Sequence, residues 1–232
     1  MQFCTSLPLP FKTDLADLKR GIAYFPLAGA IIGLICGLIF NYSSMLWNQS
    51  AASILTIVAY LILTRALHMD GFMDTIDGFF SGKPRKQILS IMKDPTVGSF
   101  AVCGALCWFG WMFAFLPLIL WQQLILILCI SRWGVIWLGL ISSYPRESGT
   151  GKFFVDNVTK SMLLPGLIIN IGLGIWLGWL NLILIIFILF YGWLVSKWSE
   201  KKIAGITGDV LGFFIESSSL LSLLILSLIN KI

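Results

Sequence analysis

Long apolar stretches recur along the chain, and they constrain its fold more than any other feature. They have roughly the length that a helix needs to cross a lipid bilayer. They fall at residues 21–40, 51–67, 97–116, 118–139, 161–180, 181–196 and 208–229. Hydrophobic residues make up 58% of the chain and charged residues only 12%, which leaves too little polar surface for a soluble domain. The sequence therefore predicts an all-α, polytopic membrane protein with about seven transmembrane helices.

Charged residues are distributed unevenly among the connections between these stretches. The connections near residues 41–50, Pro117 and Asn181 contain no Lys, Arg, Asp or Glu. If the N-terminus is cytoplasmic, these connections face outward, and every charged residue except Lys231 lies at or just inside the cytoplasmic side, as the positive-inside rule requires. The net charge of +5 suits an anionic membrane surface or a phosphorylated substrate, and we expect no nucleic-acid partner. We therefore expect a cytoplasmic N-terminus and a working surface that faces the cytosol.

No soluble domain, linker or internal repeat interrupts this pattern, so we expect a single transmembrane domain over residues 1–232. Outside the N-terminal segment, polar residues concentrate near residues 65–96, 141–160 and 197–216. The predicted topology places all three segments on the cytosolic side. They are the expected active-site segments.

Three aspartates occur together in the segment HMDGFMDTIDG. Asp70, Asp74 and Asp77 are spaced by four and three residues, so on a helix they share an arc of roughly 60°. On a soluble helix this would more often be a solvated face, but in a membrane helix each carboxylate costs roughly 2.5–3.5 kcal/mol and a compensating cation is expected. Mg²⁺ prefers carboxylate oxygens and shares its other positions with phosphates. We therefore predict a Mg²⁺ site on these aspartates, where Gly71 and Gly78 leave room for a phosphate or a backbone segment.

Two more acids, Asp209 and Glu216, occur in the segment ITGDVLGFFIE. Their spacing of seven residues places them about 20° apart on a helix. Asp209 follows Thr207 and Gly208 and could instead cap the helix that begins there. Glu216 lies two turns into apolar sequence, where a buried carboxylate needs a metal ion, a proton or a basic partner. Both are candidates for completing the metal site or orienting a substrate.

Basic residues near these acids are candidates for binding an anionic substrate. Lys93 and Asp94 precede a proline, Arg146 precedes a glycine-rich SGTGK turn, and Arg132 lies inside an apolar stretch. We expect Arg132 to face the bundle interior and to pair with an anion, either a substrate pyrophosphate or the aspartates. SGTGK lacks the P-loop spacing, and the single histidine, His68, points away from the acidic face, which makes it a weak candidate ligand. Acids and basic groups at one end of a helical bundle suit metal-assisted phosphoryl transfer.

Other functional classes also place acids on membrane helices. A CDP-alcohol phosphatidyltransferase is the nearest alternative, but Met73 and Asp74 occupy the Ala-Arg positions of its DGxxAR pattern. An ion-coupled transporter would have polar access from both faces, whereas the outer connections here carry no charge. A purely structural membrane subunit gives no reason to keep five acids on membrane helices.

Several blocks of the sequence, taken in order, resemble those of a known family. They are SLPLP, YFPLAGAIIG, HMDGFMDTIDGFF, ILSIMKDPTVGSF, CISRW, YPRESGTG and IAGITGDVLGFFIE. Together they resemble the cobalamin 5′-phosphate synthases, the adenosylcobinamide-GDP ribazoletransferases, over nearly the whole chain. The family usually has glycines where this chain has Thr64-Arg65-Ala66, and a second glycine where it has Ala204-Gly205. Neither departure touches a proposed ligand.

The resemblance implies a reaction in which a ribosyl hydroxyl of α-ribazole, or of its 5′-phosphate, attacks the phosphate that carries the cobinamide of adenosylcobinamide-GDP, and GMP leaves. It also implies a need for Mg²⁺ and a location in the bacterial cytoplasmic membrane. Which aspartate acts as the base, which form of ribazole is preferred and how many copies assemble all stay open. The predicted catalytic residues are Asp70, Asp74, Asp77, Lys93 and Arg132, of which the aspartates are the metal ligands. The predicted substrate-binding residues are Arg146, Asp94, Asp209, Glu216, Gly71 and Gly78.

Overall fold

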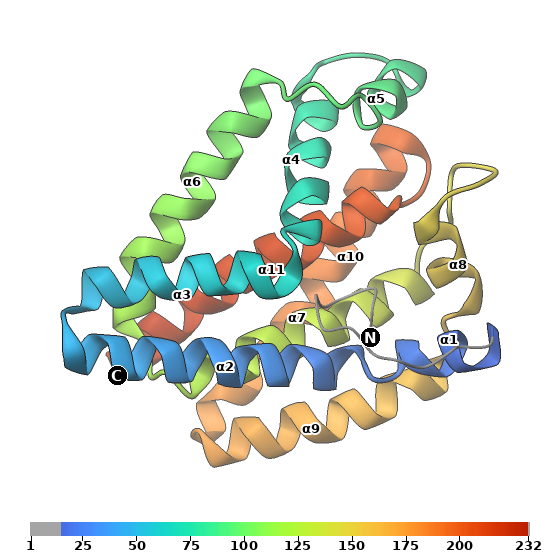
Figure 1. Ribbon diagram of the computed structural model, residues 1–232. Helices are drawn as coiled ribbons and strands as arrows, with labels where there is room; N and C mark the ends of the chain where they lie inside the picture. The colour runs from blue at the N-terminus through green and yellow to red at the C-terminus, as the bar shows by residue number, and fades with distance from the viewer. Residues whose placement is uncertain (1–14, 232) are drawn as a thin grey trace.

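The computed structural model describes residues 15–231, and all regular secondary structure in that range is helical (Figure 1). The SLPLP stretch lies outside the described residues. The longer helices are α1 (Leu15–Ile22), α2 (Phe25–Leu46), α3 (Gln49–Thr64), α4 (Leu67–Phe80), α5 (Arg85–Ile91), α6 (Ser99–Phe115), α7 (Gln123–Leu140), α8 (Thr150–Asn157), α9 (Leu163–Trp176), α10 (Ile183–Ile203) and α11 (Gly208–Ile229). Short 3₁₀ helices join some of them, namely η1 (Leu116–Leu118), η2 (Lys160–Met162) and η3 (Trp179–Leu182).

The predicted bundle of apolar helices is confirmed. Five of the described helices are long and apolar enough to cross a membrane, and the number rises to seven if each of two sharply bent pairs counts as one span. The bent pairs are α3 with α4, at 93°, and α8 with α9, at 98°. The last apolar stretch coincides with α11, whereas the 181–196 stretch extends to Ile203 because α10 continues through the polar KWSEKK turns.

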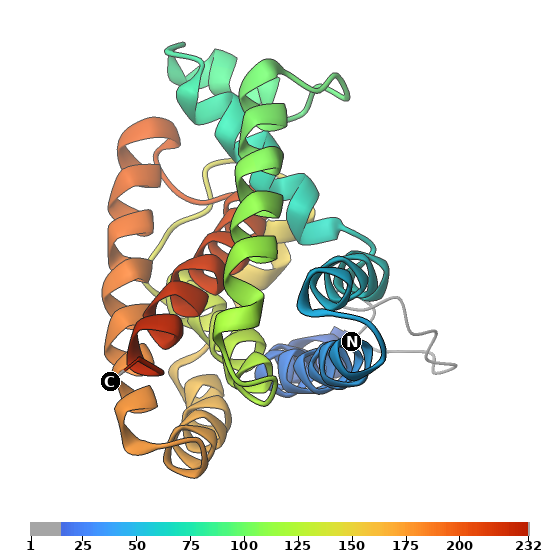
Figure 2. The ribbon, with the colours of Figure 1, turned by 90° about the vertical axis from the view of Figure 1, so that its left-hand side faces the viewer.

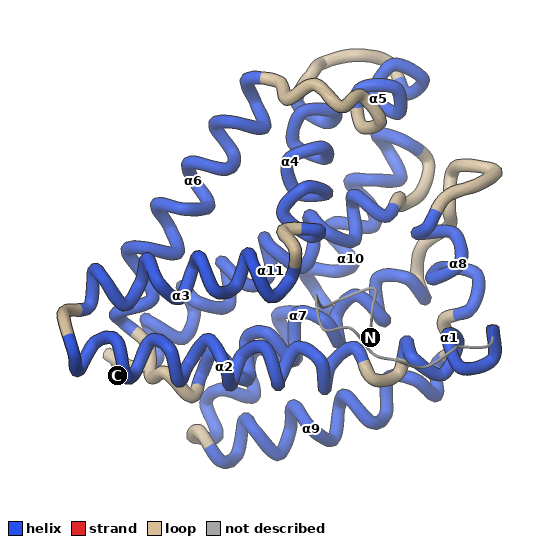
Figure 3. The backbone as a smooth tube through the Cα atoms, viewed as in Figure 1, coloured by secondary structure: helices blue, strands red, loops and turns tan. Residues whose placement is uncertain are grey.

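The helices run between two ends of the molecule (Figure 1). The α2–α3 connection and the end of α11 lie at the left in Figure 1, the side that faces the viewer in Figure 2, while α1, α5 and α8 lie at the opposite end. Figure 3 shows loops at both ends, whereas the turn between α3 and α4 lies near the middle of the molecule. The uncharged connections and the charged segments 83–94 and 146–156 therefore occupy opposite ends of the bundle.

Helix α7 forms the centre of the bundle. Of its 18-residue apolar span, 83% is buried, against 22% for the span that contains α6. Glycines of α2 permit the closest packing onto it. A Cβ atom at Gly29 or Gly33 would overlap the carbonyl groups of Leu128 or Leu124 on α7. Small residues at such contacts let helix backbones approach in a membrane, where packing replaces the hydrophobic effect as the main attraction.

The two helices that carry the acidic motifs both begin after a left-handed turn. Arg65 and Ala66 have φ values of 54° and 51° before α4, and Ala204 has a φ of 58° before α11. These three are the only non-glycine residues with positive φ between residues 15 and 231. They occupy the segments where the resembling family has glycines, and glycine adopts this conformation without the cost that a Cβ imposes. The departures from the family pattern therefore concern backbone turns.

Candidate active site

Helices α4 and α11 cross in close backbone contact near the charged end of the bundle. A Cβ atom at Gly71 of α4 would lie 2.8 Å from the carbonyl oxygen of Asp209, and one at Gly212 of α11 would lie 2.8 Å from that of His68. Real side chains do not tolerate these distances, so only glycine permits the crossing. The contact brings the HMDG and TGDVLG segments together. The predicted close approach at Gly71 is therefore made by the backbone of Asp209.

The second predicted glycine has different surroundings. A Cβ atom at Gly78 would lie 2.6 Å from Cγ of Met92 and 3.2 Å from Cγ2 of Ile88, both on or next to α5. The protein itself fills this space. The expectation that Gly78 leaves room for a phosphate is therefore wrong, and its role is to let α5 pack against α4.

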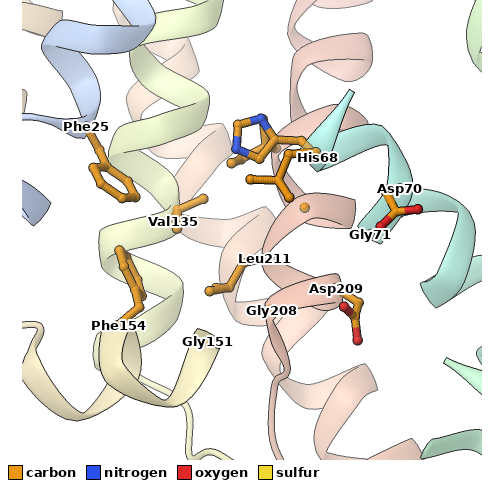
Figure 4. A pocket seen from close by; sticks show the side chains of 13 residues that line it. Phe25, His68, Asp70, Gly71, Val135, Gly151, Phe154, Gly208, Asp209 and Leu211 are labelled. Atoms are coloured by element: carbon orange, nitrogen blue, oxygen red, sulfur yellow. The ribbon is translucent and has the colours of Figure 1, made fainter. Parts of the chain in front are cut away.

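A pocket of about 650 Å³, its open mouth included, lies beside the crossing (Figure 4). Asp70 and Asp209 stand near one another on one side of it, and Phe25 and Phe154 stand on the other (Figure 4). The remaining wall is mostly apolar or glycine. It includes Leu67, His68, Gly71, Val135, Gly151, Gly208, Leu211, Gly212 and Ile215.

Four carboxylates gather around this crossing. Asp74, which is half-buried one turn beyond Asp70, lies within electrostatic reach of Asp70, Asp77, Asp209 and Arg146. Thr207 is the N-cap of α11, where its hydroxyl accepts from the Val210 N–H and donates to Asp209. The alternative that Asp209 itself caps the helix is therefore wrong, because the neighbouring threonine fills that role. We call Asp70, Asp74 and Asp209 the acidic cluster.

Two of the predicted basic residues accompany the acidic cluster. Arg146 forms an ion pair with Asp209 at 3.6 Å, and its side chain is only 14% exposed. Lys93, which is exposed, lies within electrostatic reach of the same aspartate. Tyr144 lies beside Arg146, and burial raises the pKa of its hydroxyl while the Arg146 cation opposes that shift. A largely buried arginine that pairs with a carboxylate at the pocket edge is well placed for a phosphate group.

The carboxylates suit a hard divalent cation by their chemistry. No described residue donates a hydrogen bond to the side chains of Asp70 or Asp74, and oxygen-only ligands are what Mg²⁺ prefers. Within residues 15–231, however, no group of three or more His, Cys, Asp or Glu side chains is arranged to hold a metal ion. The three aspartates of α4 thus do not form a closed metal site by themselves.

Asp77 differs from the other two aspartates because both of its oxygens are engaged. They accept hydrogen bonds from the backbone N–H groups of Gly98, at 2.6 Å, and Ala101, at 2.9 Å. These are donors at the first turn of α6, which has no capping side chain of its own. Asp77 therefore caps α6 from α4, an interaction that its spacing from Asp74 could not reveal.

Asp94 is exposed and takes part in a local turn. Its side chain accepts hydrogen bonds from the backbone N–H and the hydroxyl of Thr96, and the hydroxyl bond lowers the pKa of the carboxyl group. The turn leads into Gly98, where Asp77 caps α6. The contacts of Asp94 thus shape the loop beside the acidic cluster.

Arg132 and Glu216 lie elsewhere, and the expectation that they join the acidic cluster is not met. Glu216 is 1% exposed and lies about 10 Å along α11 from Asp209, at 1.5 Å per residue. Its two oxygens accept hydrogen bonds from the Tyr60 hydroxyl, at 2.6 Å, and the Trp108 indole, at 3.0 Å. Arg132 is fully buried and donates to the same Tyr60 oxygen at 3.2 Å. Arg132 faces the bundle interior as predicted, but it contacts Tyr60 there and not the aspartates of α4. Glu216 has this basic residue within electrostatic reach.

We call Tyr60, Trp108, Arg132 and Glu216 the buried network. Tyr60 and Trp108 gave no signal in the sequence, because a tyrosine or tryptophan in an apolar helix is ordinary. Phe25 and Phe154 of the pocket were missed as site residues for the same reason, whereas His68 was considered only as a weak candidate ligand because its helical position points away from the acidic face. Each of these residues belongs to the buried network or to the pocket because of contacts between helices, which no local sequence pattern reveals.

Comparison with known proteins identifies the family. Residues 1–227 match the family model described as cobalamin-5-phosphate synthase. An adenosylcobinamide-GDP ribazoletransferase of Fusobacterium nucleatum subsp. nucleatum is 34% identical, over 95% of this chain and 92% of that protein. Proteins of the same name from Clostridioides difficile and Clostridium acetobutylicum are each 32% identical, over 99% and 91% of this chain and 95% and 87% of their own length. No solved structure matches the chain.

The family match runs through every segment described above, from α1 to the last turns of α11. The chain also spans most of the length of the relatives that it matches. The protein therefore belongs to the cobalamin-5-phosphate synthase family.

Proposed function

We propose that this protein is an adenosylcobinamide-GDP ribazoletransferase, which acts in the final step of cobalamin synthesis. It would join adenosylcobinamide-GDP to α-ribazole, or to its 5′-phosphate, and release GMP. The family match and the names of the relatives support this activity. The structural observation that carries it is the α4–α11 crossing, where Gly71 packs on Asp209 and so gathers the acidic cluster next to Arg146.

The reaction forms one bond and breaks one bond at a phosphorus atom. A ribosyl hydroxyl oxygen bonds to the phosphorus that carries the cobinamide, and the bond from that phosphorus to the GMP oxygen breaks with its electron pair. The hydroxyl proton goes to a carboxylate of the acidic cluster, which acts as general base. Mg²⁺, when bound by these carboxylates, would supply positive charge to the phosphate oxygens. Arg146 and Lys93 would hold the pyrophosphate in line for the attack.

We further propose that the protein lies in the bacterial cytoplasmic membrane with the acidic cluster toward the cytosol. The charge-free connections at one end of the bundle and the basic segments at the other support this orientation, because basic loops stay on the cytoplasmic side. Adenosylcobinamide-GDP and α-ribazole would then enter from the cytosol.

The test uses the full chain in lipid nanodiscs, supplied with adenosylcobinamide-GDP and α-ribazole 5′-phosphate. GMP and the corrinoid product are followed by chromatography, with Mg²⁺ present and with Mg²⁺ removed by chelation. Asp74→Asn tests the acidic cluster, and Asp156→Asn is the matched control because Asp156 makes an exposed ion pair with Lys152 within α8. We expect Mg²⁺-dependent product from the wild type and the control, and none from Asp74→Asn.

Each unexpected outcome points to a specific error. No product from folded wild-type protein would overturn the proposed activity, and a CDP-activated lipid would then be tried as the donor. Product that survives chelation would remove Mg²⁺ from the proposal. An active Asp74→Asn variant would keep the enzyme and overturn the acidic cluster as its centre.

A further inference from the structure

The pocket beside the acidic cluster has an aromatic side that the reaction chemistry does not use. The rings of Phe25, at the start of α2, and Phe154, on α8, have centroids 5.4 Å apart and are tilted by 30°. Both lie across the pocket from Asp70 and Asp209 (Figure 4). The pocket is therefore divided into an apolar aromatic part and a carboxylate edge. A ligand that fills it needs a flat apolar portion joined to a portion with hydroxyl groups.

His68 adds one hydrogen-bonding group to the apolar part. Its side chain is 7% exposed, it lines the pocket, and its ring is directed from α4 toward the Val135 side of the pocket (Figure 4). Its buried Nδ1 atom has no hydrogen-bond partner in the described protein. Buried polar atoms usually have partners, so an unsatisfied imidazole in a pocket wall indicates that a ligand supplies one. A neutral imidazole offers one donor and one acceptor.

The composition of the wall discriminates between the ring systems of the two substrates. Apart from Asp70 and Asp209 at the edge, His68 is the only lining side chain among the described residues that can form a hydrogen bond. Guanine carries a carbonyl group, an exocyclic amine and ring nitrogens, which this wall would leave mostly unsatisfied. The dimethylbenzimidazole base of ribazole has apolar edges and one free ring nitrogen. One imidazole donor and two phenylalanine rings match that base.

We propose that this pocket binds the base of ribazole, with Phe25 and Phe154 against its aromatic surface and His68 hydrogen-bonded to its free ring nitrogen. This inference rests on the proposed function. The ribose attached to the base then lies at the carboxylate edge, where Asp70 and Asp209 stand. Binding the base in the apolar part thus presents the attacking hydroxyl to the acidic cluster. The guanosine of the other substrate binds outside this pocket.

The first test measures KM for each substrate separately, in nanodiscs. Phe154→Leu removes the ring but keeps an apolar side chain, and we expect it to raise KM for α-ribazole about tenfold. His68→Ala is expected to act in the same direction. KM for adenosylcobinamide-GDP and kcat at saturating α-ribazole should stay within about twofold. Phe190→Leu is the matched control, because Phe190 is 58% exposed on α10 and does not line the pocket.

A second test needs no variant and keeps the proposal falsifiable if Phe154→Leu or His68→Ala fails to fold. Binding of the α-riboside of benzimidazole and of the α-riboside of adenine to the wild type is compared by calorimetry without the second substrate. We expect the benzimidazole riboside to bind about tenfold more tightly, because the adenine amine finds no partner in the apolar part.

The outcomes separate this inference from the proposed function. If the wild type forms no product, the proposed function fails, and calorimetry alone then decides whether ribazole binds in the pocket. If product forms but Phe154→Leu raises KM for adenosylcobinamide-GDP instead, the pocket holds the guanosine substrate and the inference is overturned. Equal binding of the two ribosides, or unchanged KM values in both variants, would also overturn it.

Discussion

Asp74 and Glu216 are both carboxylates on apolar helices, but their surroundings are opposite. Asp74 is half-buried among like charges and has no hydrogen-bond donor from the described residues. Glu216 is buried deeper in the bundle, and Tyr60 and Trp108 satisfy both of its oxygens. An unsatisfied cluster of like charges costs stability and persists where a ligand compensates it, whereas a satisfied buried carboxylate holds helices together. In the proposed function, the same residue class thus serves chemistry in one region and architecture in the other.

The largest predicted effect concerns activity at the acidic cluster. Asp74→Asn should lower kcat by on the order of 10³, because it removes a charge that acts at the phosphate, while leaving the free energy of unfolding unchanged or slightly raised as like-charge repulsion falls. Steady-state GMP release and thermal unfolding in the same nanodiscs measure the two effects. A variant that loses stability in step with activity would contradict the contrast between the two regions.

The next effect concerns stability at the buried network. Glu216→Ala removes the acceptor of both Tyr60 and Trp108 and should lower the free energy of unfolding by about 3 kcal/mol. The surviving folded fraction should keep its KM values. Ser222→Ala on the same helix is the control, because the buried Ser222 hydroxyl has no hydrogen-bond partner among residues 15–231 and its loss should cost little. If Glu216→Ala were stable but inactive, Glu216 would belong to the chemistry after all.

Asp77 shares a feature with each region, since it neighbours the acidic cluster but has both oxygens satisfied, and it sharpens the comparison. As the cap of α6, its substitution by alanine should cost about 1–2 kcal/mol of stability, and Asp77→Asn, which keeps an acceptor, should cost less. Activity of Asp77→Asn should stay within a few-fold of the wild type. A loss on the order of 10³, matching Asp74→Asn, would return Asp77 to the metal ligands predicted from the sequence.

The smallest effect comes from the left-handed turns that lead into the two acidic helices. Ala204→Gly should raise the free energy of unfolding by up to about 1 kcal/mol, because glycine removes the cost of positive φ at this position. Ala105→Gly, inside α6, is the control and should destabilise by a similar amount. Thermal unfolding of both variants checks the sign. Destabilisation by Ala204→Gly would show that the positive φ of Ala204 does not lower the stability of the protein.

Much of the architecture was predictable because membrane helices are long and apolar. The apolar stretches gave the seven candidate spans, and the charge pattern gave the two ends of the bundle. The bend at Arg65 was not predicted as a break, so α4 was not foreseen as a helix turned by 93° from α3. Two consecutive non-glycine residues with positive φ carry no local sequence signal.

The site was predictable in its residue types and less so in its grouping. The structure brings together Asp70, Asp74, Asp209 and Arg146 as a charged site. The helical spacing also predicted Asp77 beside them, but it could not show that Asp77 caps the first turn of α6. Helical spacing aligns side chains on one helix only. Which of them meets another helix depends on where the helices cross.

The sequence by itself determined the membrane bundle, its charged end and the family chemistry of carboxylates and arginines, because hydrophobic length, charge asymmetry and motif order are local properties of the chain. Only the tertiary structure decided which charges are free to act. The glycine contact between Gly71 and Asp209 gathers the acidic cluster, while Tyr60 and Trp108 withdraw Glu216 from it. The physical reason is that a carboxylate's role depends on the donors and charges around it, and these come from helices far apart in sequence.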